Sequence, residues 1–209
     1  MPNAMNEKKR TKLFPYNFRL LLLAMLLMHV LMAMASFYPP IISNFGLVPQ
    51  LPERLYGIFT APFIHASWGH LTGNSIGLFI SGYLASLQAG FKRVTVFIMV
   101  VTGCLVWVFG EYGNHIGASG IVMGYYGFLF GTAVFNRNLV GAISFTVLVA
   151  VTYYMGCAFL ATLLDFSAQT SSSNHIFGFI SGLLGAYIFR RKVKKPKSAK
   201  NENRLGTKL

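Results

Sequence analysis

The stretch GASGIVMGYYGFLFGTAVF, residues 117–135, decides the fold. It carries no charged residue, and Gly120, Gly124 and Gly127 recur in it at helical spacing. An uncharged apolar segment of about 20 residues is long enough to cross the hydrocarbon core of a bilayer as a helix. Glycines along one face of such a helix let a second backbone approach closely. The stretch therefore predicts a tightly packed membrane helix with Ser119 in its first turn.

The whole chain has the composition of an integral membrane protein. It has 209 residues, of which 54% are hydrophobic and only 11% charged, whereas soluble domains carry about 25% charged residues. Six apolar segments approach or exceed membrane-spanning length: they lie at about 18–38, 68–88, 94–112, 116–135, 139–164 and 172–189. We therefore expect an all-α membrane protein, a bundle of six transmembrane helices in one domain over residues 13–192. The first segment is full length and has no small-residue cleavage site after it, which favours a retained helix over a signal peptide.

The net charge of +13 is distributed unevenly between the two sides of this arrangement. One side holds Arg54 alone as a cation, together with Glu53, Glu111 and Asp165. The other side holds nearly all the basic residues, and this excess places both termini in the cytoplasm by the positive-inside rule. These basic residues are Lys8, Lys9, Arg10, Lys12, Arg19, Lys92, Arg93, Arg137 and the run that begins at Arg190.

The two ends of the chain read as polar cytoplasmic tails, over residues 1–12 and 193–209. Their low hydrophobicity and high charge are typical of disordered segments. The basic run from Arg190 to Lys195 is interpreted as a topology anchor that touches anionic membrane lipids, in preference to a nucleic-acid site. We therefore expect lipid contact and no nucleic-acid partner.

Three polar side chains fall at matching depths. The second, fourth and sixth segments all start on the outer side, and His70, Ser119 and His175 lie in their first turns. Asn74 follows His70 by four residues and so shares its helix face. After His175, the glycines at 178, 182 and 185 again repeat at helical spacing. Close packing of the fourth and sixth helices would bring a serine hydroxyl and an imidazole within hydrogen-bond distance, about 2.6–3.2 Å.

Each of these features also has a purely structural interpretation. Gly-Ala-Ser-Gly alone is ordinary small-residue packing, and Asn74 alone is an interhelical hydrogen-bonding residue. His175 alone fits an interhelical hydrogen bond or a pore, although ionisable groups inside a membrane are costly and mark function. His29, His65 and His115 are interpreted as interface or packing residues. The shared depth of the set favours a joint site.

The residue inventory narrows the chemistry of such a site. An aspartyl mechanism needs two carboxylates, and Asp165 is the only aspartate. A zinc protease needs a ligand set such as His-Glu-x-x-His, which is absent. Cys104 and Cys157 lie inside apolar segments without a nucleophile signature. We therefore expect no metal or cofactor, and a serine nucleophile.

In this interpretation Ser119 attacks a carbonyl carbon and His175 takes its proton, giving an acyl-enzyme that water hydrolyses. No carboxylate is near His175 in the sequence, so we expect a dyad rather than a triad. His70, Asn74 and the backbone N–H of Ser119 are the candidate donors to the developing oxyanion.

These residues resemble those of the rhomboid family of intramembrane serine proteases. The resemblance covers about residues 50–190. It rests on Gly117 to Gly127, on Pro62-Phe63-Ile64-His65 followed by His70 and Asn74, and on Asn174 to Gly178 followed by Gly182.

The resemblance implies that Ser119 is the nucleophile, His175 the base, and His70 and Asn74 part of the oxyanion site. Gly117, Ala118, Gly120, Gly178 and Gly182 would form the supporting motif. It also implies single-span membrane substrates cleaved near the outer end of their helix, and a minimal six-helix bacterial form in the inner membrane with its site on the extracytoplasmic side. The fifth segment with the loop 165–173 would form a lateral gate and cap.

Two positions depart from the family pattern. Tyr56-Gly57 stands where many members have Trp-Arg, with Arg54 nearby, and Met123 stands where an aromatic residue often packs against the imidazole. Three other functions compete with proteolysis. They are a non-catalytic adaptor on the same fold, a haem carrier using His29, and a transporter, which would need interrupted helices and mid-membrane charges.

Overall fold

The computed structural model describes residues 16–135, 139–154 and 172–190. Its long helices are α1 (Tyr16–Phe37), α4 (Trp68–Ser86), α5 (Phe91–Phe109), α6 (Ser119–Phe135), α7 (Leu139–Tyr154) and α9 (Ser172–Ile188). They fall on the six apolar segments of the sequence. The two tails, Arg137, Cys157 and residues 155–171 of the expected gate and cap lie outside the described residues.

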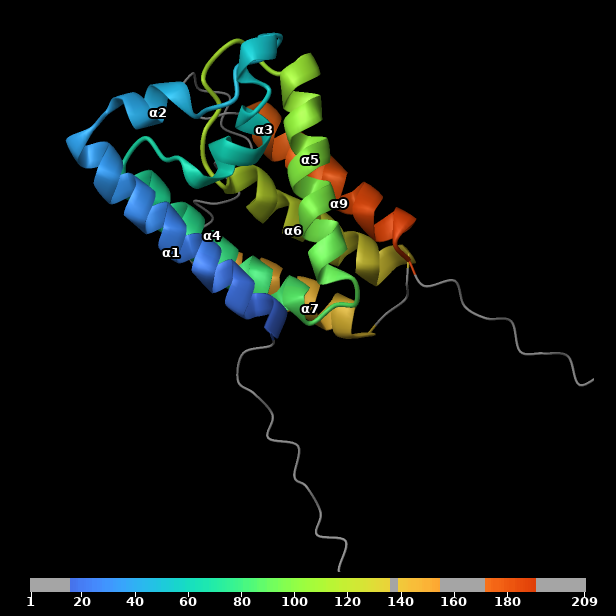
Figure 1. The fold of residues 1–209 in the computed structure, drawn as a ribbon. Helices are drawn as coiled ribbons and strands as arrows, with labels where there is room; N and C mark the ends of the chain where they lie inside the picture. Colours follow the sequence, from blue (N-terminus) through green and yellow to red (C-terminus); the bar gives the residue numbers. More distant parts are fainter. Residues whose placement is uncertain (1–15, 136–138, 155–171, 191–209) are drawn as a thin grey trace, which may run out of the picture.

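The connection between α1 and α4 contains short helical pieces. These are α2 (Pro40–Asn44), α3 (Gly57–Thr60) and two 3₁₀ turns, η1 (Pro52–Arg54) and η2 (Ala61–Phe63). Figure 1 shows the first turns of α6 and α9 close to α3, at the end of the bundle opposite the start of α1. The candidate residues therefore lie at one end of the bundle, beside this connection.

Helix α6 lies at the centre of the bundle. It packs mainly against α9 and also contacts α4, α5 and α7 (Figure 1). Most of its residues are buried, and Val122, Tyr125 and Leu129 have no exposed surface. A helix that is apolar on every side needs such a surround. Every other long helix apart from α1 is thus placed by its contact with α6.

The contact between α6 and α9 joins backbone to backbone through glycines. A Cβ built on Gly178 would lie 3.0 Å from the Cα of Gly120. A Cβ on Gly182 would overlap the carbonyl oxygen of Gly124 and lie 2.8 Å from the nitrogen of Phe128. The expected close packing of the fourth and sixth segments is confirmed. Gly185 departs from it, because its hydrogen faces Phe97 and Val94 of α5 rather than α6.

Two helices begin at residues other than those expected from the apolar pattern. Helix α5 starts at Phe91, after Gly90 in the left-handed conformation at φ 81°. Helix α6 starts at Ser119 rather than at 116, because Gly117 has φ 102° and interrupts the helical path. Apolar composition locates each segment to within a few residues, whereas these glycine conformations determine where the helices begin.

The outer surface of the bundle is apolar. On α1, Leu23 and Leu26 are more than half exposed, and so is Val96 on α5. Cys104 is exposed on α5 rather than packed inside. By length and composition, Asn17–Phe37 and Phe91–Phe109 are able to cross a membrane, while α6 and α7 are apolar but shorter. An apolar exterior of this extent fits contact with lipid.

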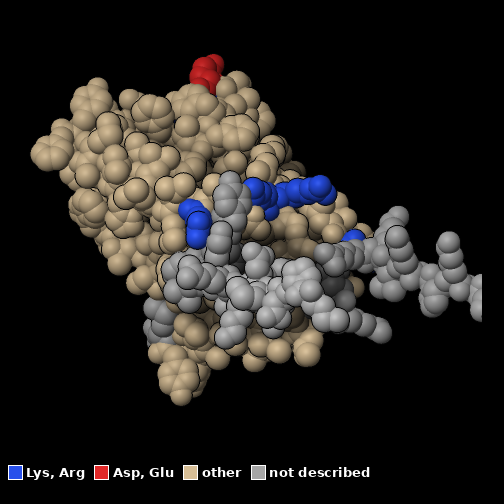
Figure 2. Space-filling view, turned by 60° about the horizontal axis from the view of Figure 1, so that its bottom comes forward, with Lys and Arg blue, Asp and Glu red and all other residues tan. Residues whose placement is uncertain are grey.

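Apart from Arg54, which lies beside Glu53 in η1, the charged residues in the described part of the chain separate by sign along the bundle. Arg19, Lys92, Arg93 and Arg190 lie where α1 and α5 start and where α9 ends. Figure 2 shows lysine and arginine side chains on this face and an acidic side chain at the far edge. The polar candidate residues therefore lie at the end of the bundle away from this basic face.

The backbone contact generates a prediction. Gly182→Ala places a methyl group against the backbone of α6, and such overpacking costs about 1–3 kcal/mol. We expect a lower unfolding temperature for the purified protein in detergent. The matched control is Gly73→Ala on α4, where a Cβ meets nothing within 4 Å and helix propensity favours alanine by about 1 kcal/mol. Equal unfolding temperatures for both variants would contradict the packing.

Candidate active site

Helix α4 presents His70 and Asn74 on one face. Ser67 caps the helix in an extended conformation, and its Oγ accepts a hydrogen bond from the backbone nitrogen of His70 at 3.2 Å. This cap fixes the first turn, as serine N-caps commonly do. One turn later the Asn74 side-chain nitrogen donates to the carbonyl oxygen of His70 at 3.1 Å. Contacts within α4 thus fix the backbone at His70 and the side chain of Asn74.

The loop before Ser119 lies directly on these two residues. A Cβ built on Gly117 would lie 2.8 Å from Cε1 and Nε2 of His70 and 3.4 Å from Nδ2 of Asn74. The positive φ and this close approach both require glycine. The backbone nitrogen of Gly117 also donates to the carbonyl of Ala61 at 2.9 Å. The structure therefore brings the Gly-Ala-Ser-Gly motif against His70 and Asn74.

Ser119 begins α6 and faces the first turn of α9. The carbonyl of Ala118 accepts hydrogen bonds from the nitrogens of Ile121 and Val122, at 2.9 and 3.1 Å, so helical hydrogen bonding begins directly before Ser119. Nδ2 of Asn174 donates to Oγ of Ser119 at 3.5 Å. His175, the next residue, is 5% exposed. Residues of all three motifs therefore meet at one end of the bundle.

Asn174 belongs to the last sequence motif, but the sequence pattern alone does not assign it to the site. Its side chain also fills the space beside Gly120, where a built Cβ would lie 3.0 Å from its Cγ. The sequence feature that points to Asn174 is its position directly before His175, on a helix whose glycines pack against α6. Polar residues in the first turn of such a helix are candidates for contact with the neighbouring first turn.

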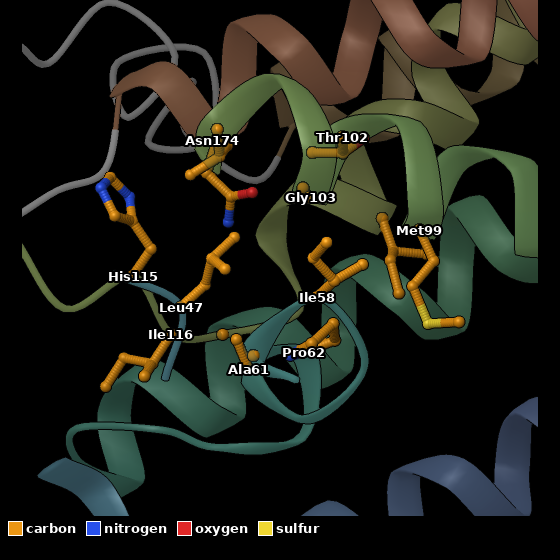
Figure 3. Close-up of a pocket in the computed structure, with 15 residues that line it drawn as sticks. Leu47, Ile58, Ala61, Pro62, Met99, Thr102, Gly103, His115, Ile116 and Asn174 are labelled. Atoms are coloured by element: carbon orange, nitrogen blue, oxygen red, sulfur yellow. The ribbon is translucent and has the colours of Figure 1, made fainter. Parts of the chain in front are cut away.

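A small cavity of about 30 Å³ adjoins this site on the side of α5. Ile58, Met99 and Thr102 line it, with Gly117 and Asn174 on the side of the site. Figure 3 shows the side chain of Asn174 directed into it from α9. Oγ1 of Thr102 is buried without a hydrogen-bond partner among the described residues. A space of this size accommodates about two water molecules.

Arg54 and Tyr56 anchor the connection between α1 and α4. The Arg54 guanidinium donates to the carbonyl oxygens of Asn44, at 2.5 Å, and of Ser43. The Tyr56 hydroxyl donates to the same Asn44 carbonyl at 2.6 Å. Exposed carbonyls at a helix end attract cations, and these carbonyls end α2. Arg54, two positions before the tyrosine, therefore supplies a cationic anchor despite the departure at Tyr56-Gly57.

The glycine of that departure has its own structural reason. A Cβ built on Gly57 would lie 2.5 Å from Cα of Leu47. Leu47 pairs with His115 through two backbone hydrogen bonds of 2.9 and 2.8 Å, in an isolated antiparallel bridge. A side chain at position 57 would therefore push against the backbone of Leu47, which pairs with the loop between α5 and α6. The sequence difference thus reflects a closer backbone approach.

His29, His115 and Met123 have local contacts that agree with a structural role. His29 is exposed on α1, and its Nδ1 donates to the carbonyl of Met25 at 2.8 Å. His115 is buried, and its Nε2 donates to the carbonyl of Glu111 at 2.7 Å. Met123 is 2% exposed within the main core. Among the residues that the structure describes, no three His, Cys, Asp or Glu side chains gather as a metal site.

His65 lies in the connection directly before α4 and is 1% exposed. Its ring meets that of His70 edge to face, with centroids 5.1 Å apart. Neither ring nitrogen has a hydrogen-bond partner within the described chain. Burial, followed by the nearby His70, lowers the pKa of His65 to about 4. A neutral imidazole therefore packs edge to face against the ring of His70.

This buried imidazole predicts a pH dependence of stability. Because its pKa is lower in the folded protein than in the unfolded chain, the unfolded chain binds the extra proton between about pH 6.5 and 4. Stability is then complete above pH 6.5 and falls as the pH decreases, by about 3 kcal/mol in total. We expect His65→Phe to remove this part of the decrease in unfolding temperature between pH 7 and pH 4. His29→Phe, on an exposed position, should keep it; an unchanged pH dependence in His65→Phe would contradict the burial effect.

Comparison with known proteins matches the part of the chain that contains the site. A family model described as the Rhomboid domain matches residues 52–192. The chain is 30% identical over 166 residues to an uncharacterized protein of Mycobacterium tuberculosis, covering 74% of this chain and 68% of that protein. It is 32% identical over 169 residues to an uncharacterized protein of Mycobacterium leprae, covering 76% and 66%. The chain therefore belongs to the rhomboid family of intramembrane serine proteases.

Proposed function

We propose that this protein is an intramembrane serine endopeptidase that cleaves transmembrane segments of membrane proteins near the outer face. Ser119 is its nucleophile and His175 its general base. The observation that carries the proposal is the close approach of Gly117 to both His70 and Asn74, because it supports an oxyanion site in which these two side chains adjoin the loop before Ser119. The backbone contact of α6 with α9 supports the second half of the site, by holding the first turn that carries His175 beside Ser119.

The proposed reaction uses these residues in sequence. Oγ of Ser119 attacks the scissile carbonyl carbon while His175 takes its proton. The oxyanion that forms accepts hydrogen bonds from His70, Asn74 and the backbone N–H of Ser119. As the first residue of α6, Ser119 has an N–H in the helical turn that lacks intrahelical acceptors. His175 then protonates the leaving amine, and water, activated by the same imidazole, hydrolyses the acyl-enzyme.

In the resting protein Asn174 donates to the Ser119 oxygen. At 3.5 Å this hydrogen bond is long and weak, so it does not prevent the serine from turning towards the imidazole. We include Asn174 in the proposed site as the residue that holds the hydroxyl in the space between α6 and α9.

The proposed orientation places this site on the extracytoplasmic side of a bacterial plasma membrane. We propose six spans in one domain over residues 13–192, with cytoplasmic tails at 1–12 and 193–209. The support is the charge separation, since Arg19, Lys92, Arg93 and Arg190 lie where α1 and α5 start and α9 ends, whereas Ser119 lies where α6 starts. Cations next to spans are retained on the cytoplasmic side and favour anionic lipid.

Covalent labelling tests the proposed chemistry. A fluorophosphonate reacts only with an activated serine, so we expect the purified wild-type protein in detergent to be labelled and both Ser119→Ala and His175→Ala to be unlabelled. Asn74→Ala should label about tenfold more slowly, since the other oxyanion donors remain. Ser36→Ala, on the far helix α1, is the matched serine control and should label like the wild type.

Absence of labelling would favour a different function. If folded wild-type protein resists several serine-reactive probes, the enzyme proposal is wrong and the adaptor function takes its place. The adaptor function would be indicated by stable binding of single-span membrane proteins without cleavage. Labelling that persists in Ser119→Ala would place the nucleophile elsewhere.

A further inference from the structure

Glu111 occupies a position that the sequence did not connect with the site. The described residues contain two acidic side chains, Glu53 in η1 and Glu111 directly after α5. The Oε2 atom of Glu111 accepts a hydrogen bond from the Ser173 hydroxyl. The backbone nitrogen of Glu111 also donates to Oγ of Ser173, at 3.4 Å. One residue of the loop between α5 and α6 thus holds one serine of α9 from two directions.

Ser173 belongs to the turn that carries the candidate base. It directly precedes Asn174 and His175, and α9 begins at Ser172. The first turn of a helix lacks intrahelical acceptors for its N–H groups and frays easily. A carboxylate at this end also favours the helix dipole. The contact with Glu111 therefore acts on the part of α9 whose order decides where Asn174 and His175 lie.

The loop that supplies Glu111 is itself attached to the nucleophile side. The carbonyl of Glu111 accepts from Nε2 of His115, and the backbone of His115 pairs with Leu47. Two residues later, Gly117 bonds to Ala61. The segment from 111 to 117 is thus held by hydrogen bonds between the start of α9 and the start of α6. Its two ends reach the two halves of the proposed site.

We propose that Glu111 is a positioning residue: its carboxylate holds Ser173 and thereby fixes Asn174 and His175 in the first turn of α9 beside Ser119. The catalytic consequence rests on the proposed function, whereas the ordering of α9 does not. The expected dyad is unchanged, because this carboxylate reaches the turn through Ser173.

Hydrogen exchange tests the ordering without requiring activity. In the full-length protein in detergent, we expect Glu111→Ala and Ser173→Ala each to speed amide exchange in residues 172–178 about tenfold. The double variant should exchange no faster than either single variant, because both remove one contact. Glu111→Gln keeps an oxygen acceptor and should stay within about twofold of wild type. Glu53→Ala is the matched acidic control and should change nothing.

The labelling rate tests the consequence for the site. We expect Glu111→Ala and Ser173→Ala to reduce the fluorophosphonate rate constant of the folded protein about tenfold, non-additively, with Glu111→Gln near wild type. A merely stabilising contact would lower the unfolding temperature and leave this rate unchanged. Unchanged exchange in both alanine variants, or additive losses in the double variant, would overturn the proposal.

The two proposals fail in different ways. If the wild type is never labelled, the proposed function is wrong, and exchange in residues 172–178 still decides whether Glu111 orders α9. If the wild type is labelled but Glu111→Ala is labelled as fast, only the positioning role is wrong. Should Glu111→Ala not fold, Ser173→Ala carries the same test from the other side of the contact.

Discussion

The backbone contact between α6 and α9 is the constraint on which the rest of the structure depends. Lipid tails are as apolar as leucine, so helices in a bilayer gain little from hydrophobic association and rely on close packing. Gly127 of α6 and Gly178 and Gly182 of α9 lack the side chains that would separate these backbones, whereas the hydrogen of Gly124 faces Ile98 of α5. The first turns of both helices then lie beside each other, which is where Ser119, Asn174 and His175 are found.

The second element of the architecture is the connection between α1 and α4. Its backbone is irregular, yet several of its backbone polar groups have partners: Arg54 and Tyr56 donate to carbonyls at the end of α2, and Leu47 pairs with His115. This arrangement holds Ala61 where it accepts from Gly117. Irregular backbone at membrane depth requires such internal satisfaction. The connection therefore acts as a frame for the loop that precedes the nucleophile.

The sequence was sufficient for features that depend on local pattern. Apolar length located the helices, and glycine spacing indicated which pair packs most closely. It was insufficient where one residue meets another far along the chain. Gly185 has the spacing of the α6 face but turns towards α5, Arg54 replaces an anchor expected at position 57, and Glu111 meets Ser173 across 62 residues. Helix spacing defines a face, but the neighbour that this face meets is set by the whole bundle.

Within the site, residue types were easier to predict than roles. Matching depth selected His70, Ser119 and His175, since helices that start on one side share a depth. It gave no reason to select Asn174, and it left His65 among packing residues, where its buried and edge-on position behind His70 agrees with that interpretation. Side-chain contacts between first turns depend on helix rotation, which the spacing of glycines defines only approximately.

The central claim is that Ser119 and His175 act on one substrate carbonyl. An amino-chloroisocoumarin tests this directly, because it acylates a reactive serine and then presents a second electrophile to an adjacent nucleophile. Peptide mapping of the treated protein should show one adduct that links the peptide containing Ser119 to the peptide containing His175. An adduct confined to Ser119 that never reaches His175, or one joined to another residue, would contradict the account.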